Sequence, residues 1–367
     1  MTGEAYFLYH SIGQYPGKAE AMAAALAEFA RGWSACDDGP WGRALARRGR
    51  FLDAWAAVIG APRETLASFE NVTTALSSLI GSLPPERLRG RRVLIAADCF
   101  PSLHFLLSGL AGPMGFALHT VPVRPGAAWV EAEDMVAAWG PDVGLALLTW
   151  VSSTSSHRID PAPLIAHGRA MGSLIGIDIT QGVGIIPFWL SDHPADFVIG
   201  SSLKWLCGGP GAAVLQVDPA LIGQCRPRLR GWFSQPDPFS WDLDAFRYAP
   251  DSRRFGHGTP GVVAEVASLP ALERWLGQDP AARLAHNREL SARLIAGADR
   301  LGLPLVSPRA ESRRGGSVML RVADGAAAVA RLRAAGAWAD ARGQVLRLSP
   351  GEMTTAAGVE RALAALG

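Results

Sequence analysis

The spacing of apolar residues changes repeatedly between two periods over residues 93–217. Short, continuous apolar runs predict buried strands, and the stretches between them have the three- and four-residue spacing of helices with one apolar face. We expect strands at 93–97, 117–121, 143–150, 174–179, 196–201 and 212–217, and helices at 103–110, 131–139 and 161–171. This alternation is typical of a mostly parallel sheet flanked by helices, so the sequence predicts an α/β fold.

The chain on either side of this stretch has a different pattern. Helices are expected at 18–29, 50–59, 282–298, 326–335 and 354–366, a short apolar run at 6–13, and strands at 318–322 and 345–348. We therefore expect an N-terminal segment (1–50) packed on the small domain, a large domain (51–253) and a small α+β C-terminal domain (254–367). Residues 224–251 have little periodicity, which is typical of a long functional loop.

Composition narrows the class of protein. The chain has 367 residues, of which 49% are hydrophobic and 19% charged, and its net charge of +2 gives no nucleic-acid footprint. The four cysteines form no CxxC pair, so neither a zinc site nor a disulfide framework is expected. The longest apolar run, 105–118, is broken by glycines and a proline, and residues 1–10 lack a secretory pattern. We expect a cytoplasmic protein that binds neither membrane nor nucleic acid.

One lysine stands out. Only Lys18 and Lys204 are lysines, and Lys204 lies between Leu203 and Trp205, where a buried strand ends near a glycine-rich turn. Arginine can supply charge but cannot form a Schiff base, whereas a desolvated lysine amine can attack a carbonyl. Lys204 is therefore a candidate nucleophile. The alternative is a lysine at a strand end that extends to solvent.

Asp178 is the second candidate, because it closes the apolar run at 174–179. The carboxyl ends of parallel strands are where ligands bind in open α/β sheets. A carboxylate placed there could keep a pyridine nitrogen protonated, which makes the ring an electron sink. The alternative is a capping residue for the following segment.

Several blocks together carry a family resemblance. They are Asp-Ile-Thr-Gln at 178–181, Ala-Asp-Phe-Val-Ile-Gly-Ser-Ser-Leu-Lys-Trp-Leu at 195–206, Gly-Gly-Pro-Gly at 208–211, Gly-Trp-Phe at 231–233, Arg-Phe-Gly-His-Gly-Thr-Pro at 254–260, Asp-Ala-Arg at 340–342 and Val-Leu-Arg-Leu-Ser-Pro at 345–350. From about residue 65 onward the chain resembles the fold type I pyridoxal-phosphate enzymes of the class V aminotransferase group, and kynureninase most of all.

The resemblance implies pyridoxal 5'-phosphate as cofactor and an amino acid as substrate. Lys204 matches the lysine that forms the Schiff base, and Asp178 the partner of the pyridine nitrogen. The remaining cofactor-binding positions that it implies are Thr73, Thr74, Phe100, Gln181, Ser202, Trp232 and Thr259. Trp232 and Thr259 would come from a neighbouring subunit, so a homodimer with a shared site is implied. Arg347 matches the arginine that holds the substrate carboxylate, and Ser152 is the substrate-binding candidate of the 150–156 segment.

The residues themselves leave alternatives for three of these positions. Thr73 and Thr74 open a helix whose N-terminus offers free N–H groups to a phosphate, but ordinary capping would explain them too. Phe100 could be a core residue instead of a ring that stacks on the cofactor. Arg347 has apolar neighbours on both sides along a strand, so it points to the opposite face, which could be solvent.

Departures from the kynureninase pattern leave the reaction open. Leu203 replaces a phosphate-binding Tyr, and residues 150–156 carry small hydroxyl groups in place of the kynureninase motif. No cysteine follows Cys225, which excludes the mobile-loop nucleophile of a cysteine desulfurase. The resemblance implies hydrolytic cleavage of the Cβ–Cγ bond of a kynurenine-type substrate. The alternatives are a class V aminotransferase, a β-lyase, or a homologue that binds the cofactor without catalysis.

Overall fold

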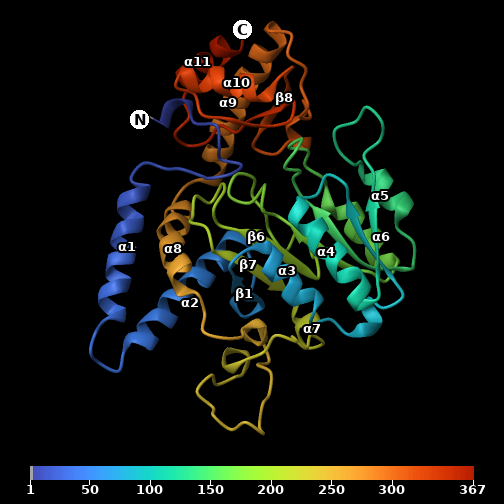
Figure 1. Ribbon diagram of the computed structural model, residues 1–367, viewed down its shortest axis with the longest axis vertical. Helices are drawn as coiled ribbons and strands as arrows, with labels where there is room; N and C mark the ends of the chain where they lie inside the picture. Colours follow the sequence, from blue (N-terminus) through green and yellow to red (C-terminus); the bar gives the residue numbers. More distant parts are fainter. Residues whose placement is uncertain (1–2) are drawn as a thin grey trace.

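The computed structural model describes residues 3–367 as a large body around a central sheet and a smaller body at one end (Figure 1). Within these residues the large sheet has seven strands in the order β1-β7-β6-β5-β4-β2-β3. Their bounds are Leu66–Phe69 (β1), Arg92–Ala96 (β2), Ala117–Val121 (β3), Val143–Thr149 (β4), Leu174–Asp178 (β5), Phe197–Ser201 (β6) and Ala213–Val217 (β7). Neighbours from β3 to β6 are parallel, whereas β7 is antiparallel to both β6 and β1. The predicted mostly parallel α/β sheet is confirmed.

Helices cover both faces of this sheet, because its inner strands are apolar on both sides. They are α2 (Pro40–Ile59), α3 (Val72–Ile80), α4 (Pro101–Met114), α5 (Ala132–Ala138), α6 (Pro161–Ala170), α7 (Pro219–Ile222) and α8 (Val262–Leu276), and α1 (Lys18–Trp33) packs outside them on α2 and α8. Along β6, Phe197 joins the buried cluster that contains Leu76 of α3, while Val198 joins the cluster that contains Trp55 of α2. Alternate residues of a strand point to opposite faces, so each face has its own core.

The small body is an antiparallel sheet covered by helices. In the described part of the chain, β8 (Val318–Arg321), β10 (Val345–Leu348) and β9 (Asp340–Arg342) lie in that order. The helices are α9 (Pro280–Arg300), α10 (Gly325–Ala334) and α11 (Ala356–Leu366). The N-terminal segment completes this body, since Phe7 is fully buried in its core and Tyr6 and Leu8 form bridges to Trp338 and Ser349.

The structure distributes two segments differently from the boundaries expected from sequence. α8 packs against α1 and α2, and its Leu269 and Leu272 belong to the core of the large sheet. Only the first residues of the 1–50 segment lie on the small body, while α1 runs along α8 (Figure 1). An apolar helical face shows that a helix packs on something, but it does not show on which core.

Four helices and strands of the structure were not expected from the sequence. β1, β9 and α7 are very short, and α8 contains Pro270, which normally argues against a helix interior. Short 3₁₀ turns lie at Gly3–Ala5, Arg63–Thr65, Pro85–Arg87, Trp232–Ser234, Ser252–Phe255 and Glu311–Arg313. Among residues 3–367, no helix has both the length and the apolar character that crossing a membrane requires.

Candidate functional site

The chemically interesting residues lie at the carboxyl ends of the parallel strands. Phe100 follows β2, Ser152 follows β4, Asp178 is the last residue of β5, and Lys204 follows β6. Carboxyl ends of parallel strands share one edge of a sheet, so these side chains converge. The small body meets this edge, since Arg347 of β10 donates from Nη1 to the carbonyl oxygen of Ser153 at 3.3 Å.

Lys204 has the environment of a reactive amine. Its Nζ lies 5.3 Å from the centroid of the Phe100 ring, and the residue is partly buried. Burial lowers the pKa of Lys204 to about 8; the charge of Asp178 opposes this shift and that of Arg347 adds to it. A substantial fraction of the amine is therefore unprotonated near neutral pH, as a nucleophile requires.

This pKa can be measured directly. In the cofactor-free protein, acetylation of Lys204 by acetic anhydride is expected to rise with a midpoint near pH 8, because burial holds its pKa at about 8 instead of the ordinary 10.5. A lowered pKa means that the amine stays unprotonated to lower pH, so the folded protein reacts where the denatured protein does not. Peptide mass spectrometry separates Lys204 from Lys18. A folded-state midpoint above pH 10 would contradict the prediction.

Asp178 is buried and fixed by its own turn. Its Oδ1 accepts hydrogen bonds from the backbone N–H of Thr180 at 3.0 Å and from the Thr180 hydroxyl at 2.5 Å. Burial raises the pKa of Asp178, and the bonds from Thr180 and the charge of Lys204 oppose this shift. The bonds close a local turn and cap no helix. A cationic partner would relieve the unfavourable burial of this carboxylate.

The turn at the start of α3 forms a reciprocal cap. The Asn71 side chain accepts from the backbone N–H of Thr74 at 2.9 Å, and the backbone N–H of Asn71 donates to the Thr74 hydroxyl at 3.4 Å. That hydroxyl also lies 3.2 Å from Glu70 Oε2. Capping thus occupies Thr74, whereas Thr73 forms no side-chain hydrogen bond within residues 3–367. The first N–H groups of α3 still offer an anion site.

Arg347 is buried, with 6% of its surface exposed, so the solvent-exposed alternative is wrong. Its Nε donates to Asp340 Oδ1 at 2.8 Å, and its Nη2 donates to Asp340 Oδ2. Ser152 is also buried, and its hydroxyl donates to the backbone oxygen of Asp98 at 3.2 Å. The small body therefore brings a guanidinium to the strand ends that carry Lys204.

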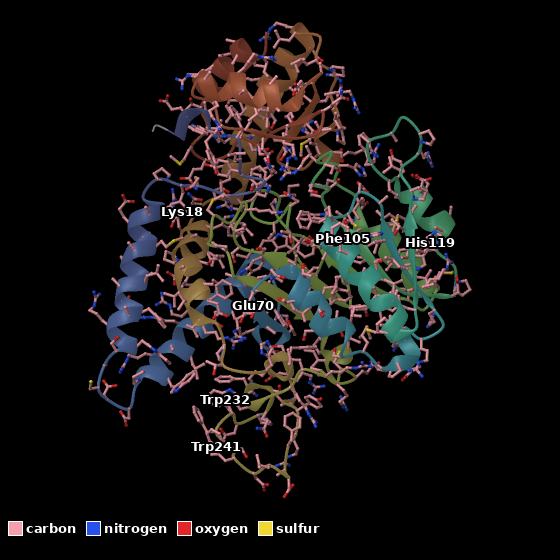
Figure 2. The ribbon with its side chains drawn as sticks, in the orientation of Figure 1. Lys18, Glu70, Phe105, His119, Trp232 and Trp241 are labelled. Atoms are coloured by element: carbon pink, nitrogen blue, oxygen red, sulfur yellow. The ribbon has the colours of Figure 1, made fainter. Side chains whose placement is uncertain are left out.

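Four of the predicted cofactor-binding residues are less directly connected with Lys204. Gln181 is half-buried in the turn after Asp178. Ser202 is fully buried, and its hydroxyl accepts from Trp55 Nε1 at 3.0 Å. Trp232 packs on Trp41, with ring centroids 5.5 Å apart, at the end of the molecule away from the small body (Figure 2). Thr259 lines a separate cavity of about 440 Å³. Trp232 and Thr259 thus do not join Lys204 within one chain, and their predicted role would require a neighbouring subunit.

Two nearby residues were missed as candidates. His10, which is buried, lies 3.0 Å from Asp340 through Nε2, and a Cβ at Gly13 would lie 1.9 Å from the backbone oxygen of Lys204. The N-terminal segment therefore packs directly on the lysine turn, and its Gly13 N–H donates to Leu203 O at 3.0 Å. The sequence of residues 6–13 gave no indication of these contacts. The sequence signal for Asp340 was its place in the Asp-Ala-Arg block.

Comparison with known proteins gives consistent results. The family model described as aminotransferase class-V matches residues 53–336. A kynureninase of Deinococcus radiodurans is 32% identical over 301 residues, which cover 80% of this chain and 68% of the relative. An isopenicillin N epimerase of Streptomyces clavuligerus is 29% identical over 86% of this chain and 82% of its own.

Solved structures share the fold. The complex of the cystine C-S lyase C-DES with cysteine persulfide has a TM-score of 0.86 and 18% identity, covering 99% of this chain and 97% of its own. The apo cysteine desulfurase of Thermococcus onnurineus also has a TM-score of 0.86 and 18% identity, covering 98% and 93%. At this identity the likeness concerns the fold alone. No group of three or more His, Cys, Asp or Glu side chains in residues 3–367 is placed to hold a metal ion.

Proposed function

Since this chain belongs to the aminotransferase class-V family, we propose that it is a pyridoxal 5'-phosphate-dependent enzyme that acts on an amino acid. One observation carries the proposal: a lysine amine with a pKa lowered to about 8 lies over an aromatic ring and within the field of a buried carboxylate. No other lysine of the chain lies at the strand ends.

The donor set fits this cofactor. Lys204 can hold its aldehyde covalently, Phe100 offers a flat apolar surface to a ring, and Asp178 offers a buried carboxylate to a pyridinium nitrogen. The free N–H groups of α3 suit a phosphate, and they compensate in part for Leu203, which cannot bind one. When bound, the cofactor withdraws electrons from the α-carbon of the substrate.

The roles of the chain's own groups follow from their positions. Arg347 would orient the substrate through its carboxylate, since a guanidinium fork matches that group with two parallel hydrogen bonds. The Lys204 amine would also serve as the base that accepts the proton from the α-carbon of the substrate. Asp178, which is buried, would be the partner that keeps a pyridine nitrogen protonated.

We propose kynureninase-like hydrolysis of the Cβ–Cγ bond of a kynurenine-type substrate as the reaction. The similarity to the Deinococcus radiodurans kynureninase, 32% identity over 80% of this chain, supports it. A second candidate is chemistry confined to the α-carbon, such as epimerisation or transamination. It is supported by the epimerase relative and by the hydroxyl residues at 152–156, which replace the kynureninase pattern.

We also propose that the enzyme is a homodimer. Trp241, which lies at the lower end of the molecule in Figure 2, is 75% exposed, and Leu243, two residues later in the chain, is 93% exposed. Large apolar side chains that gather on an exposed loop are typical of an interaction surface. A neighbouring subunit that covers this loop would also be placed to use Trp232 and Thr259.

The function can be tested by product analysis. Protein loaded with pyridoxal 5'-phosphate is expected to absorb near ~420 nm, as lysine-bound forms of this cofactor do. It is then incubated in D₂O with a panel of amino acids that includes L-kynurenine and 3-hydroxykynurenine, and products are identified by mass. Alanine together with an anthranilate indicates Cβ–Cγ hydrolysis. Deuterium at the α-carbon without cleavage indicates epimerisation, and a keto acid indicates transamination. Protein that takes up no cofactor would overturn the whole proposal.

A further inference from the structure

The guanidinium of Arg347 is held along one edge by a single carboxylate. Asp340 and Arg347 are paired across neighbouring strands β9 and β10. Arg347 Nε donates to Asp340 Oδ1 at 2.8 Å, and Nη2 donates to Asp340 Oδ2. This is a side-on bidentate pair, which fixes both the position and the plane of the guanidinium.

Counting the N–H donors of the Arg347 guanidinium shows how many of them are not used within the protein. A guanidinium has five N–H groups in a rigid fork. Asp340 takes one from Nε and one from Nη2, and the backbone oxygen of Ser153 takes one from Nη1 at 3.3 Å. One N–H on Nη1 and one on Nη2 are left. The end of the fork, where one N–H of each of these two nitrogens points the same way, is the second edge of a guanidinium that can match a carboxylate.

Asp340 is itself held by a buried chain of polar groups. His10 Nε2 lies 3.0 Å from Asp340 Oδ1, His10 Nδ1 lies 2.6 Å from the Ser349 hydroxyl, and that hydroxyl lies 2.6 Å from the Ser317 hydroxyl. A carboxylate only accepts hydrogen bonds, so His10 donates to it from Nε2. Burial lowers the pKa of His10, and the hydrogen bond with Asp340 opposes this shift. Ser349 is fully buried and closed off by these contacts, so this Ser-His-Asp order is a support and not a nucleophile.

We propose that Asp340 is a positioning residue that aims the end of the Arg347 fork at the substrate carboxylate, and that His10 keeps Asp340 in place. The inference rests on the proposed function, in which Arg347 binds that carboxylate. It adds that the N-terminal segment, which carries His10, takes part in substrate recognition. The competing possibility is that Asp340 neutralises Arg347 and competes with the substrate. The two possibilities predict opposite effects when the Asp340 charge is removed.

The experiment compares two probes that differ only in a carboxylate. L-alanine and L-alaninamide are titrated into holoenzyme, and each Kd is read from the change in cofactor absorbance. For Asp340→Asn we expect L-alanine to bind about ten- to a hundredfold more weakly, because a small misplacement of an orienting group has effects of this size. Binding of L-alaninamide should not change. Arg342→Gln is the matched control, since Arg342 also approaches Asp340, at 3.6 Å, but is exposed and lies outside the fork.

Each outcome supports or contradicts the positioning role of Asp340. Unchanged or tighter binding of L-alanine by Asp340→Asn overturns the positioning role alone. A wild-type holoenzyme that does not prefer L-alanine over L-alaninamide overturns the role of Arg347 in the proposed function, and this inference with it. If Asp340→Asn does not fold, His10→Ala takes its place and should weaken L-alanine selectively, while His10→Gln, which restores an N–H donor, should recover at least part of the affinity. No selective loss in His10→Ala would then overturn the proposal.

Discussion

Replacement of Lys204 by alanine is expected to abolish both covalent capture of pyridoxal 5'-phosphate and turnover. The Lys204 amine is the only one at the strand ends, and its pKa is lowered to about 8 by burial. A general base alone contributes about 10²–10⁴-fold to rate, and the variant also loses the covalent anchor. Borohydride reduction followed by peptide mass spectrometry measures the adduct, and single-turnover kinetics with the substrate found by the panel measure the rate.

The chain offers a matched control, because its only other lysine has a different task. Lys18 Nζ donates to the backbone oxygens of Gly13 at 2.6 Å and Gly208 at 3.3 Å, which tie the N-terminal segment to the glycine-rich turn. Figure 2 shows Lys18 at the upper end of α1. Lys18→Ala should keep the reduced adduct on Lys204. An adduct that persists in Lys204→Ala and disappears in Lys18→Ala would reverse the assignment.

Arg347→Ala is expected to weaken binding of an amino acid by about 2–5 kcal/mol, the usual cost of removing one partner of a desolvated charge pair. Arg347 is 6% exposed, so its contacts are made largely out of water. The loss should fall on KM or on the Kd for L-alanine, and cofactor loading should be retained. Arg347 also lowers the pKa of Lys204, so the acetylation midpoint of Lys204 should move above pH 8 in this variant.

Arg347→Lys separates charge from geometry. Lysine keeps the positive charge but has no planar fork, so it cannot hold Asp340 and a substrate carboxylate along two edges at once. We expect it to remain closer to the alanine variant than to the wild type in the Kd for L-alanine. Full affinity in Arg347→Lys would show that the site needs only a cation, and an unchanged Kd in Arg347→Ala would remove this residue from the site.

The packing of the N-terminal segment explains why residues far apart in the chain act on one site. Gly13 lies so close to the backbone oxygen of Lys204 that a side chain there would clash, and His10 three residues earlier reaches Asp340. The same few residues therefore contact the lysine turn of the large body and the Asp340 side chain of the small one. A change in the packing between the two bodies would therefore alter the surroundings of both Lys204 and Asp340.

The sequence by itself determined the layered α/β fold and the order of its reactive groups. Strand and helix periods depend on near neighbours, so the runs ending at Asp178 and preceding Lys204 could be assigned before any contact was known. That both residues follow parallel strands was enough to expect them at one edge. Lys204 could also be identified from the sequence, because the chain has only one other lysine.

Only the tertiary structure decided how Arg347 is held, which core α8 joins, and that His10 contacts Asp340. Arg347 is held by Asp340 on the neighbouring strand and by Ser153, which lies 194 positions away. His10 and Asp340 are separated by 330 positions. Contacts of this kind produce no periodic pattern in the sequence, because they do not depend on the spacing of neighbouring residues. Arg347 is an example. Its flanking leucines indicated the face of the strand on which it lies, but only the structure, in which it contacts Ser153, showed that this face is buried.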